Sequence, residues 1–105
     1  RLAQCRPGRT ELADLFAQCV AAMRMLARAG FAHGDLSPFN LLVHRGRLVV
    51  IDVPQVVDIF ANPQSASYLE RDCGNVCRWF AARGLETEEF DQLFGDLMAE
   101  AVARW

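Results

Sequence analysis

The chain has 105 residues, of which 52% are hydrophobic and 23% are charged, a composition typical of a globular domain and unlike that of a disordered tail. At this length we expect a single domain, residues 1–105, that buries roughly two-thirds of the surface its unfolded chain would expose. Eleven basic and thirteen acidic side chains give a net charge of −2, which provides no electrostatic reason to expect binding to nucleic acid or to a membrane surface.

The first predicted element is an amphipathic helix between Thr10 and Gly30. Its apolar side chains recur at three- and four-residue steps and form one stripe: Leu12, Leu15, Phe16, Cys19, Val20, Met23 and Leu26. Thr10 is suited to cap the start of this helix, and Gly30 is suited to the left-handed conformation that ends it. The preceding Arg6-Pro7-Gly8-Arg9 predicts an irregular entry.

Two short β-rich runs, Leu41-Leu42-Val43 and Leu48-Val49-Val50-Ile51, predict a β-hairpin. The intervening His44-Arg45-Gly46-Arg47 contains a glycine that permits the positive φ of a tight turn. Such a hairpin places Asn40 at the start of one strand and Asp52 at the end of the other, and these are neighbouring positions in an antiparallel pair. The two residues can therefore share one metal ion.

A loop is expected over residues 53–66, followed by two helices. Ser67-Tyr68-Leu69-Glu70 has the pattern of a capping box that opens the first helix, and Gly84 is expected to close it. Thr87-Glu88-Glu89 predicts the start of the second helix, with acidic residues that favour the helix dipole. The apolar faces are Leu69, Cys73, Val76, Cys77 and Phe80 in the first, and Phe90, Leu93, Phe94, Leu97, Met98, Ala101 and Val102 in the second.

The stretch His33-Gly34-Asp35-Leu36-Ser37-Pro38-Phe39-Asn40, together with Asp52, carries the candidate chemistry of the chain. Asp35, Asn40 and Asp52 have the spacing with which a kinase-type site holds a hydroxyl nucleophile and magnesium against the terminal phosphate of a nucleotide. Asp35 would accept the hydroxyl proton, whereas Asn40 and Asp52 offer the hard oxygen ligands that Mg²⁺ prefers. Ser37 either contacts phosphate or forms a hydrogen bond within the loop.

The sequence contains no recognisable lysine or glycine-rich loop that would bind the phosphates of the nucleotide in such a site. All eleven basic residues are arginine, so no lysine is available to hold the phosphates. Neither Gly-x-Gly-x-x-Gly nor Gly-x-x-x-x-Gly-Lys-Ser/Thr occurs in the chain. We therefore expect the amino-terminal nucleotide-binding lobe to be absent from these residues and to be a partner of the chain.

About half of the chain resembles the carboxy-terminal lobe of RIO-type atypical protein kinases. His33-Gly34-Asp35-Leu36-Ser37, followed by Asn40, is similar to the catalytic loop of that family. Ile51-Asp52-Val53-Pro54-Gln55 resembles its metal-binding loop, and Arg71-Asp72 with Asn75 resembles its next helix. The last three residues would tie that helix to the catalytic loop.

The resemblance implies an α+β, mostly helical fold: a kinase-like carboxy-terminal lobe with a helix, a catalytic loop, a β-hairpin and two helices. It implies an ATP-dependent serine/threonine kinase or ATPase whose phosphate acceptor the residues do not name. Asp35 would be catalytic, Ser37, Asn40 and Asp52 would bind the cofactor, and Asn40 and Asp52 would hold Mg²⁺. His33 would orient the backbone under the metal-binding loop. The isolated chain is expected to bind Mg-ATP weakly and to be inactive.

Two other functions fit the same residues. A small-molecule phosphotransferase of the aminoglycoside type shares the His-Gly-Asp…Asn…Asp skeleton, and it would need a substrate pocket beyond the last helix. An isolated lobe that serves as a non-catalytic binding fragment would also lack the lysine. The intact set of Asp35, Asn40 and Asp52 favours an enzyme over such a fragment.

The four cysteines, Cys5, Cys19, Cys73 and Cys77, contain no Cys-x-x-Cys pair. They favour small apolar core residues in a reducing compartment over a metal site, so we expect a cytoplasmic protein. The longest apolar run, Leu48-Val49-Val50-Ile51, is far too short to span a bilayer. Because a missing lobe would leave apolar surface exposed, we also expect self-association as a homodimer through the first helix or the hairpin.

Overall fold

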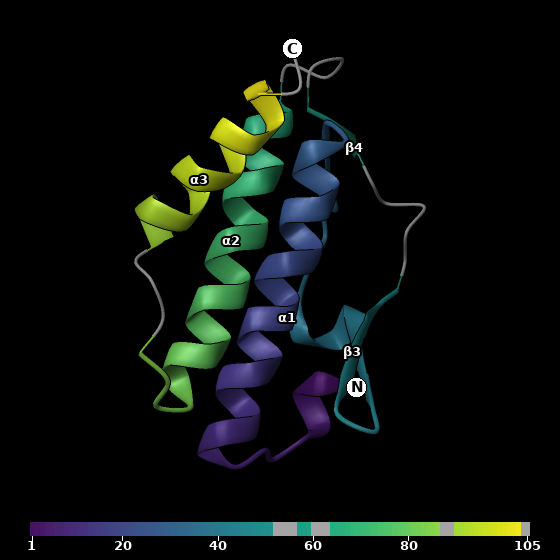
Figure 1. The fold of residues 1–105 in the computed structure, drawn as a ribbon, viewed down its shortest axis with the longest axis vertical. Coiled ribbons are helices and arrows are strands. Elements are labelled where there is room, and N and C mark those ends of the chain that lie inside the picture. Colours follow the sequence, from purple (N-terminus) through teal and green to yellow (C-terminus); the bar gives the residue numbers. More distant parts are fainter. Residues whose placement is uncertain (52–56, 60–63, 87–89, 104–105) are drawn as a thin grey trace.

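Three α-helices account for most of the described residues, and short strands lie along one side (Figure 1). The structure is a computed structural model, and it describes residues 1–51, 57–59, 64–86 and 90–103. The helices are α1 (Arg9–Arg28), α2 (Ser65–Ala82) and α3 (Phe90–Ala103). Short 3₁₀ turns occur at η1 (Leu2–Gln4) and η2 (Pro38–Asn40). The predicted α+β, mostly helical fold is confirmed.

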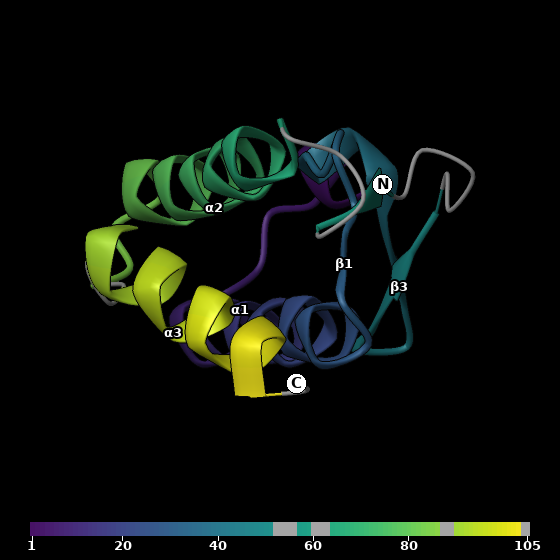
Figure 2. The same ribbon diagram turned by 90° about the horizontal axis from the view of Figure 1, so that it is seen from above.

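Each helix buries one apolar face in a common core. Helix α3 packs against both α1 and α2, and the view along the bundle shows α1 and α3 on one side with α2 opposite (Figure 2). The rings of Phe16 and Phe80 meet edge to face across α1 and α2, with their centroids 5.1 Å apart, a geometry that aromatic pairs favour. The buried helix residues include Leu12, Leu15, Cys19, Met23, Ala27, Leu69, Cys73, Val76, Phe80, Leu93, Leu97 and Ala101.

Helix α1 starts earlier than the sequence predicts. It begins at Arg9 after Gly8, and no side chain caps its first turn, so the prediction that Thr10 is the cap is wrong. Gly8 is the residue at the N-cap position, and its carbonyl accepts the first hydrogen bond of the helix, from the N–H of Leu12 over 2.8 Å. The predicted end is confirmed, since Gly30 has a φ of +88°.

Helix α2 also begins before the predicted capping box. It starts at Ser65, which places Ser67 inside the first turn, where its N–H donates to the carbonyl of Gln64 over 3.0 Å. The capping box is therefore wrong, because a backbone bond already uses the N–H at this position. Gly84 closes the helix as predicted, with a φ of +87°. The predicted start of the last helix, at residues 87–89, lies outside the described residues.

The predicted hairpin is present as strands β2 (Leu41–His44) and β3 (Arg47–Val50). Leu41 pairs with Val50, and His44 pairs with Arg47. The turn contains only Arg45 and Gly46, whose φ values are +52° and +78°, as a type I′ turn requires. The connection is thus shorter than the four residues expected, because His44 and Arg47 extend the strands.

A second strand pair joins β1 (Phe31–Ala32) to β4 (Val57–Asp58) in antiparallel register. The prediction of an uninterrupted loop over residues 53–66 is therefore wrong at β4. Neither two-residue strand has a periodic pattern of its own, and each exists because the other supplies its hydrogen bonds. The pair is extended by the N–H of Ile59, which donates to the carbonyl of Gly30 over 2.8 Å. It places the start of the 33–40 loop beside the core.

The cysteines are free thiols, and Cys19, Cys73 and Cys77 lie in the core as predicted. Burial raises the pKa of Cys19 and of Cys73 to about 12. Among the described helices, none has the length and hydrophobicity needed to cross a membrane.

At pH 8, iodoacetamide should therefore label Cys5, which is half-buried, and should reach Cys19 and Cys73 only after unfolding. The reason is that the thiolate is the reactive form, and burial of the other two thiols both disfavours it and blocks access. Mass spectrometry of peptides from folded and urea-treated protein measures the labelling. Equal labelling of Cys19 and Cys5 in the folded protein would contradict the buried placement.

Candidate active site

The loop from His33 to Asn40 connects β1 to the hairpin and contains most of the predicted site. Gly34 has a φ of +91°, a conformation that side chains with a Cβ rarely adopt. Ser37 caps the 3₁₀ turn η2, because its Oγ accepts a hydrogen bond from the N–H of Phe39 over 3.2 Å. Of the two roles expected for Ser37, the structure shows the hydrogen bond within the loop. This bond does not use the hydroxyl proton, which remains available to donate to a phosphate.

A buried carboxylate on α2 fixes the backbone of this loop. Asp72 is only 1% exposed, and its Oδ2 accepts from the N–H of Gly34 over 2.8 Å while its Oδ1 accepts from the N–H of Leu36 over 3.0 Å. Burial raises the pKa of the Asp72 carboxyl, and the two N–H donors act against that rise. The charge is thus solvated by the loop in place of water.

Two neighbours of Asp72 hold the carbonyl groups of the same loop residues. Arg71 donates from Nη2 to the carbonyl of Gly34, and Asn75 donates from Nδ2 to the carbonyl of Leu36 over 3.0 Å. Gly34 and Leu36 are therefore each bound through both N–H and C=O by side chains of α2. The expectation that Arg71, Asp72 and Asn75 tie this helix to the loop is confirmed.

His33 connects the loop to the end of the hairpin. Its Nε2 lies 2.8 Å from the carbonyl oxygen of Ile51, and its Nδ1 accepts from the N–H of Asp35 over 3.2 Å. Because a carbonyl only accepts, Nε2 carries the proton, and the neutral tautomer satisfies both bonds. With both ring nitrogens occupied, His33 orients the backbone as predicted and is not a candidate general base.

Asn40 is bonded to both segments that flank the candidate site. Its Nδ2 donates to the carbonyl of Asp35 over 2.5 Å, and its own carbonyl accepts from the N–H of Ile51 over 2.9 Å. Because the amide nitrogen faces Asp35, the amide oxygen is the atom left to contact a cation. The side chain of Asp35 is exposed. Asp52 lies outside the described residues, so its role as a ligand stays a prediction.

The hairpin is also anchored by a residue that sequence reasoning missed. Gln18 on α1 donates from Nε2 to the carbonyl of Gly46 over 2.8 Å, and its Oε1 accepts from the N–H of Leu48 over 2.8 Å. One side chain thereby bonds the turn and the second strand. The sequence contains no signal for this contact, because a glutamine beside an apolar stripe is most often solvated.

The described donor atoms fit a hard cation and a hydroxyl substrate. The amide oxygen of Asn40 is the type of ligand that Mg²⁺ accepts, and the carboxylate expected from Asp52 would follow Ile51 directly. The exposed carboxylate of Asp35 can accept a proton from a hydroxyl group brought to it. Loop, helix and hairpin are linked by hydrogen bonds, so the loop backbone and the side chain of Asn40 are held before any ligand arrives.

Comparisons with known proteins agree with this arrangement. Residues 1–93 match the RIO domain family. The chain is 47% identical over 80 residues to the RIO-type serine/threonine-protein kinase Rio1 of Haloferax volcanii. It is 37% identical over 83 residues to the RIO-type serine/threonine-protein kinase Rio2 of Methanocaldococcus jannaschii. The alignments cover 76% and 78% of this chain but only 25% and 30% of those relatives.

Among solved structures, the chain is similar to the Rio2 kinase of Chaetomium thermophilum, crystallised as an ADP/Mg²⁺-phosphoaspartate complex. The TM-score is 0.69 at 23% sequence identity, and the match covers 97% of this chain and 37% of that chain. The likeness shows that the fold is an α+β, kinase-like one. The chain corresponds to little more than a third of that structure.

Proposed function

This chain belongs to the RIO domain family, and we propose that it forms the carboxy-terminal lobe of an ATP-dependent serine/threonine kinase or ATPase. The observation that carries the proposal is the position of Asn40. Its side chain is bonded to the carbonyl of Asp35, and its backbone is bonded to Ile51, the residue before Asp52. Asn40 is thus bonded to Asp35 and to the residue that precedes Asp52 in the chain, which supports a joint role for the three residues.

Each residue has a role that its chemistry supports. Asp35 accepts the proton of the acceptor hydroxyl as that oxygen approaches the terminal phosphate of ATP. The side-chain oxygens of Asn40 and Asp52 hold Mg²⁺, and the hydroxyl of Ser37 donates to a phosphate oxygen. The magnesium ion, when bound, offsets the negative charge on the phosphates.

We assign nucleotide binding to an amino-terminal lobe that lies outside these residues. The chain contains no lysine and no glycine-rich phosphate loop. The Rio1 and Rio2 kinases described above are three to four times as long as the aligned segment, since that segment covers 25% and 30% of their lengths. The part of those proteins that lies outside the alignment leaves room for the missing contacts.

The isolated chain should therefore bind Mg-ATP with a dissociation constant above about 1 μM, which corresponds to a binding free energy weaker than about −8 kcal/mol. Phosphoryl transfer relies on positioning and charge stabilisation, and most of the phosphate contacts would be missing. Isothermal titration calorimetry of residues 1–105, with the full protein titrated in parallel, measures the difference. Micromolar or tighter binding by the isolated chain would show that the nucleotide site lies within these residues.

A further inference from the structure

A cavity of about 610 Å³ lies between the amino-terminal segment and the end of α2. Its lining consists of residues 3–7 together with Ala82 and Arg83. Among the described residues, no member of the 33–40 loop lines it, so the cavity is separate from the candidate active site. Its volume is in the range of pockets that hold small ligands.

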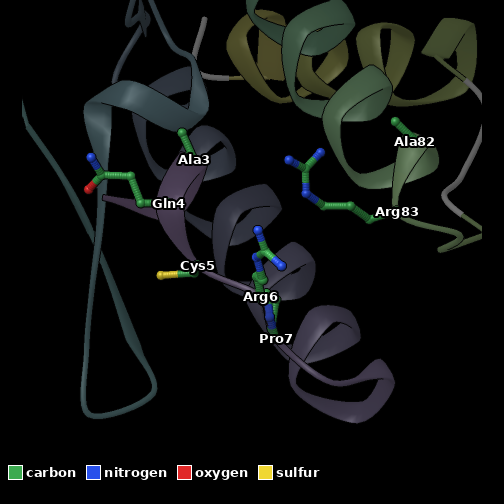
Figure 3. Close-up of a pocket in the computed structure, with 7 residues that line it drawn as sticks. All are labelled: Ala3, Gln4, Cys5, Arg6, Pro7, Ala82 and Arg83. Carbon is green, nitrogen blue, oxygen red and sulfur yellow. The ribbon is translucent and has the colours of Figure 1, made fainter.

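The charge of this cavity comes from two arginines. Figure 3 shows the guanidinium groups of Arg6 and Arg83 extending from opposite walls toward the same space, whereas the side chains of Gln4 and Cys5 point away from it. No acidic residue belongs to the lining, and the ion pairs of the described chain involve other arginines. Two positive charges thus face one cavity in a chain whose net charge is −2.

The head group of Arg83 is held in place before any ligand binds. Its guanidinium carbon lies 3.7 Å from the centroid of the Trp79 ring, and its Nη1 donates to the carbonyl of Trp79 over 3.3 Å. Stacking of this kind fixes a planar guanidinium and leaves its other N–H groups available. The favourable interaction of a positive side chain with the carboxy-terminal end of a helix dipole explains an arginine at position 83. It does not explain why Arg6 faces the same cavity.

We propose that this cavity binds a phosphate monoester between Arg6 and Arg83. A phosphate monoester carries a charge of about −1.5 to −2 at pH 7 and offers three acceptor oxygens, which match two guanidinium groups in charge and in geometry. A carboxylate has a single charge and would leave one of the two cations uncompensated. The cavity is larger than a phosphate group, so the ligand is either a small phosphorylated metabolite or a phosphorylated side chain. The proposal does not depend on the function proposed for Asp35.

The test is calorimetric titration of the full protein with O-phosphoserine and with a short phosphoserine peptide, each compared with its unphosphorylated form. We expect both phosphorylated probes to bind, and Arg6→Gln and Arg83→Gln each to weaken binding at least about tenfold. Arg47→Gln, an equal change of charge at an exposed position of β3, should leave binding unchanged. Tighter binding of the peptide identifies a protein source of the phosphate, and equal binding identifies a small molecule.

Undiminished binding by both variants would overturn the proposal, as would an equal loss in Arg47→Gln, which would indicate unspecific charge attraction. Binding that is lost in Ser37→Ala and kept in Arg6→Gln would place the phosphate at the catalytic loop instead. Arg83→Gln also removes the stack on Trp79 and so alters the helix end. If that variant unfolds, Arg6→Gln decides alone, because the side chain of Arg6 makes no hydrogen bond to any described residue.

Discussion

Replacing Asp35 with asparagine in the full protein is expected to reduce phosphoryl transfer by about 10²- to 10⁴-fold, the usual contribution of a positioned acid–base group. Asparagine has nearly the same size, but it cannot accept the proton of the attacking hydroxyl. The change should leave the fold intact, because the Asp35 side chain is exposed and the loop is held through its backbone. Steady-state kinetics at saturating Mg-ATP measure the effect.

The matched control is Asp91→Asn, the same chemical change at an exposed position in the first turn of α3. It should leave turnover unchanged. Thermal unfolding of both variants should show a midpoint within a few degrees of the unmodified protein, which separates lost chemistry from lost structure. Turnover at the unmodified rate in Asp35→Asn would refute the catalytic role of this residue.

Replacing Asp72 with alanine is expected to lower the free energy of unfolding by about 2–5 kcal/mol. The N–H groups of Gly34 and Leu36 would both lose their acceptor in a region where water is excluded. Asp72→Asn should lower the free energy of unfolding by less than Asp72→Ala, because the amide oxygen can still accept from one of the two N–H groups. The other N–H group would face the amide nitrogen and remain without an acceptor. Urea denaturation followed by circular dichroism gives both values.

Glu70→Ala provides the control for Asp72→Ala on the same helix. Glu70 is exposed, and its replacement should change the free energy of unfolding by no more than about 0.5 kcal/mol. Equal effects of Glu70→Ala and Asp72→Ala would mean that the carboxylate of Asp72 does not hold the loop. A loss of stability in Asp72→Ala that Asp72→Asn fully restores would assign the effect to side-chain volume, not to the paired acceptors.

The candidate site was predictable where its evidence lies within a short stretch of chain. The spacing within one loop predicts Asp35 and Asn40 as site residues, whereas the roles of Ser37, Arg71, Asp72 and Asn75 are what the family resemblance implies. The contact made by Gln18 was not predictable. Its partners, Gly46 and Leu48, lie 28 and 30 residues further along the chain, and no periodic pattern links such positions.

The sequence by itself determined the elements whose causes are local. The apolar stripe of α1 follows from side-chain periodicity. The positive φ of Gly30 and Gly84, shortly after the ends of α1 and α2, and of Gly46 in the hairpin turn follow from the conformational freedom of glycine. Each depends on residues within a few positions of one another, so the local sequence is enough to predict it.

Only the tertiary structure decided which distant groups meet. The strands β1 and β4 exist because each completes the hydrogen bonds of the other, and Asp72 accepts from Gly34 and Leu36 only once α2 has packed beside the loop. Helices α1 and α2 likewise start at Arg9 and Ser65, after Gly8 and Gln64, without the side-chain caps that local patterns favoured. Such pairings depend on which buried polar groups remain unsatisfied after the core forms, and that is a property of the packed chain as a whole.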